Sequence, residues 1–261
     1  MEFSVLIYNT LFNRGFENIG AITSKYAPDF LCLQEVDTSD DNLNKIRQYG
    51  YELADYANSF IKFDKVYGAA TFYNANKFRF LSSDSFDIST NISEWFYTLV
   101  QLIFGINKPK TVLRTDFVDR SMGKKVTLCN MHLIVIASNA LRVNHINKAL
   151  KWLRLPKGSG LVVGGDFNYL PYQRKRLEKT MKRYGLTEAT KNVHQTIEFS
   201  QSGKKEKMNI FQAFFIKQID KFFAHHMKND YVFYKNLRLR KNQRLEVRYS
   251  DHFPILSVFK I

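Results

Sequence analysis

The chain has 261 residues and a formal net charge of +15, with hydrophobic residues at 45% and charged residues at 24%. These proportions are those of a globular protein and exclude a collagen-like or intrinsically disordered chain. A chain of this length can bury a core that needs no disulfide or zinc for stability, as one large domain or two small ones.

The positive charge is concentrated in the C-terminal third. Residues 171–261 carry 20 Lys and Arg against 8 Asp and Glu, whereas residues 1–170 carry 19 against 16. Such a field attracts polyanions such as nucleic acid, phosphoinositides or an acidic membrane surface. A solvated surface would carry the same charge, so charge alone does not select the partner.

The cysteines and the apolar segments indicate the compartment. Cys32 and Cys129 each lie inside an apolar run, which predicts buried free thiols and no disulfide framework. The opening MEFSVLIYN has no basic region and no cleavage site, so no signal peptide is expected. The stretch from Ile92 to Ile106 is too short and too polar to span a bilayer. We therefore expect a soluble, cytoplasmic, monomeric protein with no transmembrane segment.

Hydrophobic patterning predicts strands alternating with helices along the chain. In chain order, the first half is expected to contain a strand at 3–8, a helix at 16–26, a strand at 30–36, a helix at 42–49, and strands at 67–73, 78–86, 111–118 and 126–133. The second half is expected to contain helices at 139–153 and 172–184 around a strand at 161–164, a polar loop at 191–209, and strands at 216–223, 231–234 and 255–259. This alternation is typical of an α/β layered sandwich, and since no linker divides the chain we expect a single domain over residues 1–261.

Polar side chains occupy the ends of several predicted strands, or lie just after or just before one: Asn9, Glu35, His132, Asp166, Asn168, Asp220, Asp251 and His252. In layered α/β proteins, ligand sites form where strand ends converge. Carboxylates and amides suit a hard cation, and imidazoles beside them suit proton transfer. Each residue alone has an ordinary structural explanation, such as a turn at Gly165-Asp166 or a structural histidine at His132.

The order of these motifs resembles that of the endonuclease/exonuclease/phosphatase superfamily. The matching segments are LIYN ending at Asn9, Gln34-Glu35, NMHL at 130–133, GDFN at 165–168, QID at 218–220 and SDH at 250–252. The resemblance spans residues 5 to 256 and implies a four-layer α/β/β/α sandwich, with two packed mixed sheets flanked by helices. Two motifs depart from the family pattern. Tyr8 precedes Asn9 where the family often has Trp, and Lys221 follows Asp220 where the family usually has an aromatic residue.

The resemblance also implies a Mg²⁺ site, with Mn²⁺ as a substitute. Glu35 would bind the cation, since a hard dication prefers carboxylate and water oxygens. Asn9 would lie beside it as a neutral partner. Asp251 would support a metal-bound water or a second cation.

The remaining matched residues would carry out phosphodiester hydrolysis. Asp166 would accept a proton from the attacking water, and Asn168 would hydrogen-bond a phosphoryl oxygen. His252 would donate to a non-bridging oxygen, while Asp220 would accept from its other ring nitrogen and fix the tautomer. His132 would contact phosphate.

Two basic regions and one aromatic segment bear on the substrate. The cluster just before the SDH motif is expected to line the site and to bind several phosphates: Arg238, Arg240, Lys241, Arg244 and Arg248. The basic helix at 172–184 fits either a nucleic-acid contact or a solvated face. The segment 92–106 is expected to be an amphipathic core helix, with a base-stacking wedge or a lipid-inserted helix as alternatives.

The leading prediction is a Mg²⁺-dependent nuclease or DNA-end-processing phosphodiesterase that binds nucleic acid. The alternative with the same chemistry is a sphingomyelinase-like or phosphoinositide-directed enzyme acting on anionic lipid. From another class of protein, a catalytically idle nucleic-acid-binding module on this fold is the third hypothesis.

Overall fold

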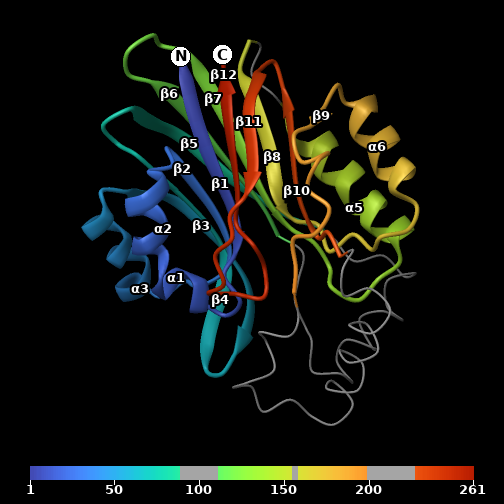
Figure 1. Ribbon diagram of the computed structural model, residues 1–261, viewed down its shortest axis with the longest axis horizontal. Coiled ribbons are helices and arrows are strands. Elements are labelled where there is room, and N and C mark those ends of the chain that lie inside the picture. Colours follow the sequence, from blue (N-terminus) through green and yellow to red (C-terminus); the bar gives the residue numbers. More distant parts are fainter. Residues whose placement is uncertain (89–110, 155–157, 199–226) are drawn as a thin grey trace.

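Two six-stranded mixed sheets pack against each other in the computed structural model, which describes residues 1–88, 111–154, 158–198 and 227–261 (Figure 1). The first sheet has the strand order β11-β12-β1-β2-β4-β3 and the second β5-β6-β7-β8-β10-β9. One pair near the middle of each sheet is parallel, β1 with β2 and β7 with β8.

The strands of the first sheet are β1 (Glu2–Asn9), β2 (Phe30–Asp37), β3 (Glu52–Lys62), β4 (Lys65–Tyr73), β11 (Arg238–Arg244) and β12 (Ile255–Lys260). Those of the second are β5 (Phe78–Asp87), β6 (Thr111–Asp119), β7 (Lys125–His132), β8 (Gly160–Asp166), β9 (Thr187–Glu188) and β10 (Asp230–Lys235). The described helices are α1 (Arg14–Glu17), α2 (Ile19–Tyr26), α3 (Asp40–Asn44), the 3-10 helix η1 (Lys45–Tyr49), α5 (Asn139–Trp152) and α6 (Arg174–Arg183).

Strand β1 shows why the sheets have two buried faces. Its side chains alternate between the faces of the sheet, as in any strand. Val5 and Ile7 pack into the core between the two sheets, whereas Leu6 and Tyr8 pack into the core beneath the first group of helices. The run VLIY is therefore apolar at every position.

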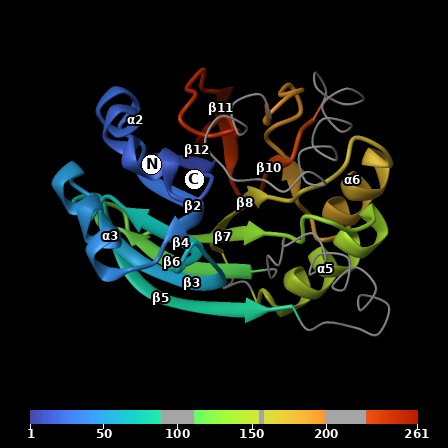
Figure 2. The ribbon, with the colours of Figure 1, turned by 90° about the horizontal axis from the view of Figure 1, so that it is seen from below.

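Helices cover the outer face of each sheet, and Figure 2 shows the two groups on opposite sides of the sandwich. Phe16 of α1 and Ile22 of α2 pack on the first sheet. Ile146 of α5 and Leu177 of α6 pack on the second. This arrangement confirms the predicted four-layer α/β/β/α sandwich.

Most predicted strands and helices are present, and Cys32 and Cys129 are buried free thiols as expected. Strands β3, β9 and β11 were not predicted. The segments expected at 92–106 and 216–223 lie outside the described residues, and the loop expected at 191–209 is described up to residue 198. None of the described helices is long and apolar enough to cross a membrane.

Candidate active site

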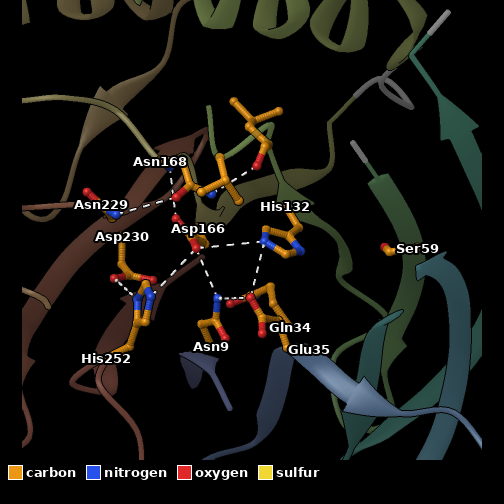
Figure 3. A network of polar contacts seen from close by, with 12 residues as sticks. Asn9, Gln34, Glu35, Ser59, His132, Asp166, Asn168, Asn229, Asp230 and His252 are labelled. Atoms are coloured by element: carbon orange, nitrogen blue, oxygen red, sulfur yellow. Dashed lines mark hydrogen bonds and ion pairs between the residues drawn. The ribbon is translucent and has the colours of Figure 1, made fainter. Parts of the chain in front are cut away.

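Polar residues at the ends of β1, β7 and β8 and near the end of β2 meet at one edge of the sandwich, the lower edge in Figure 1. The parallel pairs end together because their registers match, with Asn9 opposite Gln34 and His132 opposite Asp166. The loop before β12 brings His252 to the same edge. Figure 3 shows these side chains in one network.

Asn9 joins the two sheets at this point. Its Nδ2 donates to Oε1 of Glu35 at 3.2 Å and to Oδ2 of Asp166 at 2.9 Å, while its Oδ1 accepts from the backbone N of Leu11 at 3.0 Å. Asn9 is 1% exposed and the two carboxylates are 2% exposed. The amide therefore holds two buried carboxylates from different sheets side by side.

A β-bulge places the carboxylate of Glu35. The pairing of β2 with β4 shifts register between Leu33 and Val36, and Glu35 has a left-handed backbone conformation with φ 57°. A bulge redirects a side chain that regular strand alternation would point elsewhere. Gln34, beside it, donates from Nε2 to Oδ1 of Asn130 on β7 at 2.6 Å and fixes the bulge to the second sheet.

A tight turn after β8 places Asp166 and Asn168. The backbone N of Asn168 donates to Oδ1 of Asp166 at 2.8 Å, so one carboxylate oxygen closes the turn while Oδ2 faces Asn9. Asn168 has φ 48° and its Nδ2 donates to the carbonyl oxygen of Leu133 at 2.9 Å. Asp166 thus acts both as the turn residue and as a site carboxylate.

His252 and Asp230 form a buried pair. Nδ1 of His252 donates to Oδ2 of Asp230 at 2.7 Å, and Nε2 lies 3.7 Å from Oδ2 of Asp166. Ser250 supports the loop, since its hydroxyl donates to the carbonyl oxygen of Asn9 at 2.8 Å and accepts from the backbone N of His252 at 3.1 Å. Oδ1 of Asp251 lies 4.0 Å from Nε2 of His252.

His132 lies between the two carboxylates that Asn9 joins. Its Nε2 is 3.7 Å from Oε1 of Glu35 and 3.8 Å from Oδ2 of Asp166. The side chain is 1% exposed. It is therefore part of the network rather than a separate structural histidine.

Burial and charge raise the pKa values of two groups in the site, for different reasons. Burial raises the pKa of Asp166 above its ordinary value, although the positive charge of His252 opposes the rise. Burial alone would lower the pKa of His252, but the carboxylates of Asp230 and Asp166 outweigh it and raise that pKa to about 10. The pocket thus holds a carboxylate that accepts a proton more readily than usual beside an imidazolium that keeps its proton at neutral pH.

The donor set fits a hard divalent cation. Glu35, Asp166, Asp230 and Asp251 are each at most 7% exposed, and they outnumber the two imidazoles beside them. Among the described residues, no three His, Cys, Asp or Glu side chains are grouped as a ready-made metal cage. Mg²⁺ commonly binds through one or two carboxylates and keeps several waters, so a pocket of this kind suits it.

Asp230 fills the place at Nδ1 of His252 that the sequence interpretation gave to Asp220, which lies outside the described residues. The bond leaves no room for a second acceptor at that nitrogen, so the assignment of this role moves to Asp230. The sequence contains the signal: Asp230 is followed directly by Tyr231, the aromatic residue missing after Asp220. Asn229 and Thr196 were also missed; the hydroxyl of Thr196 accepts from the backbone N of Asp230 at 3.0 Å.

Of the five cations expected to line the site, the structure places three away from it and two nearer to it. Strand β11 pairs with β12 so that Arg238 lies opposite Lys260, and Arg240 binds Glu2 at 3.0 Å, at the end of the sheet away from Asn9. Lys241 lies opposite Val258, in the middle of β12. These three positions do not line the site, and the expectation that they do is corrected.

Arg244 and Arg248 lie nearer the site. Their guanidinium carbons are 4.3 and 5.4 Å from the ring centre of Phe253, the residue after His252. Each also forms an ion pair, Arg244 with Glu246 at 2.6 Å and Arg248 with Glu198 at 2.8 Å.

Several solved structures share this fold. The human Nocturnin catalytic domain superposes with a TM-score of 0.70 at 16% identity, covering 99% of this chain and 94% of that one. D. rerio TDP2 complexed with a single-strand DNA product gives 0.65 at 14% identity, covering 100% and 99%. A mannosyl-6-phosphatase from Bacteroides thetaiotaomicron gives 0.65 at 16% identity, covering 99% and 100%. At these identities the likeness shows the fold alone.

The sequence itself shows the family. No curated protein matches the chain. The Endonuclease/Exonuclease/phosphatase family, however, matches residues 6–252, from within β1 to the histidine that Asp230 holds. This chain therefore belongs to the Endonuclease/Exonuclease/phosphatase family.

Proposed function

We propose that the protein is a Mg²⁺-dependent phosphodiester hydrolase that acts on nucleic acid. The observation that carries the proposal is the buried network in which Asn9 holds Glu35 and Asp166 together, next to the His252–Asp230 pair. A phosphodiester is an anionic electrophile, so its hydrolysis needs charge neutralisation, an oriented water and a stabilised leaving oxygen. The site offers groups for the first two needs.

Glu35 would hold Mg²⁺, with Asp251 supporting a water bound to it. The cation, when bound, would polarise a phosphoryl oxygen and offset its negative charge. Asn9 presents N–H groups to Glu35 and Asp166 in this structure. Its part is therefore to orient the two carboxylates, which would otherwise repel each other.

The chain's own residues would handle the proton and the developing charge. Asp166 would accept the proton of the attacking water, a role favoured by its raised pKa. His252, charged at neutral pH and fixed by Asp230, would donate from Nε2 to a non-bridging phosphoryl oxygen. Asn168 and His132 border the same pocket and would bind the phosphate.

Charge supports nucleic acid as the substrate class. The excess of cations over anions in residues 171–261 suits a chain of phosphates. Arg244 and Arg248 stack on Phe253 beside His252. The likeness to a TDP2 structure holding a single-strand DNA product points in the same direction.

A panel of assays tests the proposal: single- and double-stranded DNA, RNA, a 5′-tyrosyl DNA end, sphingomyelin vesicles and inositol phosphates, each with Mg²⁺ and with EDTA. We expect Mg²⁺-dependent cleavage of a nucleic-acid substrate. Asp166→Asn and His252→Gln should each lower kcat by about 10²- to 10⁴-fold. Lys124→Gln, exposed on the β6–β7 turn at the opposite edge of the sandwich, is the matched control and should keep wild-type turnover.

Undiminished cleavage in EDTA, or wild-type turnover by both site variants, would refute the proposal. Turnover of sphingomyelin or inositol phosphates in the absence of any nucleic-acid cleavage would replace the substrate class with the lipid-directed one.

A further inference from the structure

Helix α6 presents an unusually cationic face to solvent. Its apolar residues Leu177 and Met181 are buried against the second sheet. The exposed residues of the remaining surface include five cations, which together we call the α6 basic face: Lys175, Arg176, Lys179, Lys182 and Arg183.

The α6 basic face is electrostatically unsatisfied within the described part of the chain. The helix has one acidic residue, Glu178, and Arg174 binds it at 3.1 Å while also binding Glu188 at 2.6 Å. None of the five exposed cations has an ion-pair partner among the described residues. Like charges three and four residues apart destabilise a helix, and this face contains several such pairs.

The start of the helix adds a second unfavourable arrangement. Its first turn has no acidic residue and begins Arg-Lys-Arg, and the capping residue Gln173 makes no side-chain cap. Cations at a helix N-terminus oppose the helix dipole. A sequence that breaks two local rules of helix stability at once, without compensating ion pairs among the described residues, is a candidate for an external function.

The position of α6 connects this charge to the active site. The helix follows directly on the turn that contains Asp166 and Asn168, and the hydroxyl of Tyr169 donates to the carbonyl oxygen of Gln173 at 3.0 Å. The helix therefore begins near the edge of the sandwich that carries the site and runs along its flank (Figure 1). Its ten residues span about 15 Å, a length that covers several phosphates of a nucleic-acid strand.

We propose that the α6 basic face binds the phosphate backbone of the nucleic-acid substrate on one side of the scissile phosphodiester. This inference rests on the proposed function and adds the surface along which the substrate would bind. A flexible strand can pass from the flank of the sandwich round to the site at its edge.

An anionic membrane suits the α6 basic face less well than nucleic acid. A helix that lies in a bilayer surface turns an apolar face toward the lipid, whereas the apolar residues of α6 face the protein core. A flat bilayer against this flank would also lie away from the site, which is at the edge of the sandwich. The outward surface is cationic without an apolar part, as a backbone contact requires.

The test compares wild-type protein with the variant K175Q/R176Q/K179Q/K182Q/R183Q. Binding of a labelled single-stranded DNA 20-mer and of its RNA counterpart is measured by fluorescence anisotropy in EDTA, over a range of salt concentrations. We expect the variant to bind at least about tenfold more weakly at low salt, with the slope of log Kd against log salt shallower by up to about 3.5, because each lost phosphate contact contributes about 0.7. In Mg²⁺, KM for the 20-mer should rise while kcat and the hydrolysis of bis(p-nitrophenyl) phosphate stay unchanged.

A matched pair of double variants separates position from charge. K179Q/R183Q removes two cations from the α6 basic face, and K124Q/K125Q removes two exposed cations from the β6–β7 turn and the first position of β7, at the other edge. Only the first should weaken binding. Because glutamine forms helices about as well as lysine and arginine and like-charge repulsion is removed, the α6 variants should melt no lower than wild type.

An unchanged Kd and salt slope in the five-residue variant would overturn the proposal. So would unchanged nucleic-acid binding together with lost binding to vesicles containing an anionic lipid, which would assign the face to membranes. Failure of wild-type protein to hydrolyse bis(p-nitrophenyl) phosphate or any nucleic acid in Mg²⁺ would instead refute the proposed function. The anisotropy measurement does not depend on turnover, so it tests the α6 proposal separately.

Discussion

His252 is buried and surrounded by carboxylates. Asp230 binds its Nδ1 at 2.7 Å, and Asp166 and Asp251 lie within 4.0 Å of its Nε2. Burial opposes the charged form, but these partners outweigh it and raise the pKa of His252 to about 10. Because an unfolded histidine titrates near pH 6.5, the folded chain binds this proton more tightly than the unfolded chain does.

The shift predicts a pH dependence of stability in the metal-free protein. Stability from His252 is fully present below about pH 6.5 and is lost as pH rises through about 10. Each tenfold change in proton affinity is worth about 1.4 kcal/mol, so the loss should be on the order of 4 kcal/mol. Denaturant unfolding in EDTA between pH 6 and 10 measures it.

Asp230→Asn should flatten that dependence, because the main partner of the imidazolium is removed. The control is Asp29→Asn, which removes a buried carboxylate at the start of β2, 3% exposed and bonded to Ser4 and Lys77. It should lower stability without changing its slope with pH. Equal slopes in wild type and Asp230→Asn would contradict the assignment of His252 as the group concerned.

Single residues also show where sequence reasoning reaches its limit. Asn9, Glu35, His132 and Asp166 could be found because each comes at the end of an apolar run, and His252 because it lies just before one. The partner of His252 could not be chosen from the sequence, since both Asp220 and Asp230 stand beside apolar runs. Only the three-dimensional path of β10 brings Asp230 to Nδ1.

Two glycines of β8 allow close contacts, one with the first sheet and one with the neighbouring strand β7. Gly164 faces Ile7 of the first sheet, whereas Gly165 faces the backbone of β7: a methyl group there would lie 1.9 Å from the carbonyl oxygen of Met131. Gly165 also has φ 145°, a conformation that other residues rarely adopt. The residue that follows it is Asp166.

Gly165→Ala should therefore destabilise the protein by about 3 kcal/mol or more and displace Asp166. Gly164→Ala meets the flexible end of Ile7 at 2.7 Å and should cost less. Urea unfolding of the two variants, with the activity of any folded Gly165→Ala protein, checks this. Equal destabilisation of both would show that the backbone contact with Met131 does not decide the outcome.

Elements were predictable where their side chains are buried, and missed where they are not. Strands β1, β2 and β7 are apolar and were found from composition and pattern. Strand β11 has the sequence RLRKNQR, and its position comes only from pairing with β12. Strand β3 is likewise half exposed along much of its length. Both are edge strands, for which hydrogen bonds to one neighbour replace the hydrophobic signal.

At the scale of the whole molecule, each sheet contributes one half of the site. The first sheet brings Asn9 and Glu35, and the second brings His132 and Asp166. The network thus depends on the packing of the two sheets against each other, through core residues such as Ile7 and Val162. The sequence predicted the layers because strands and helices alternate, but the contact of one sheet's carboxylate with the other's is a tertiary property.

The position of β11 at the edge of the first sheet suggests another role for its cations. An edge strand offers unpaired backbone groups to any other strand, and proteins block such templates with charged side chains. Arg238, Arg240 and Lys241 put this protection on β11.

R238T/R240V/K241T should therefore permit strand addition from a second copy, seen as concentration-dependent light scattering, whereas R238K/R240K should remain dispersed. Clear solutions of the first variant at high concentration would speak against this role. The cations that do not reach the candidate site would then serve to keep the protein from assembling on itself.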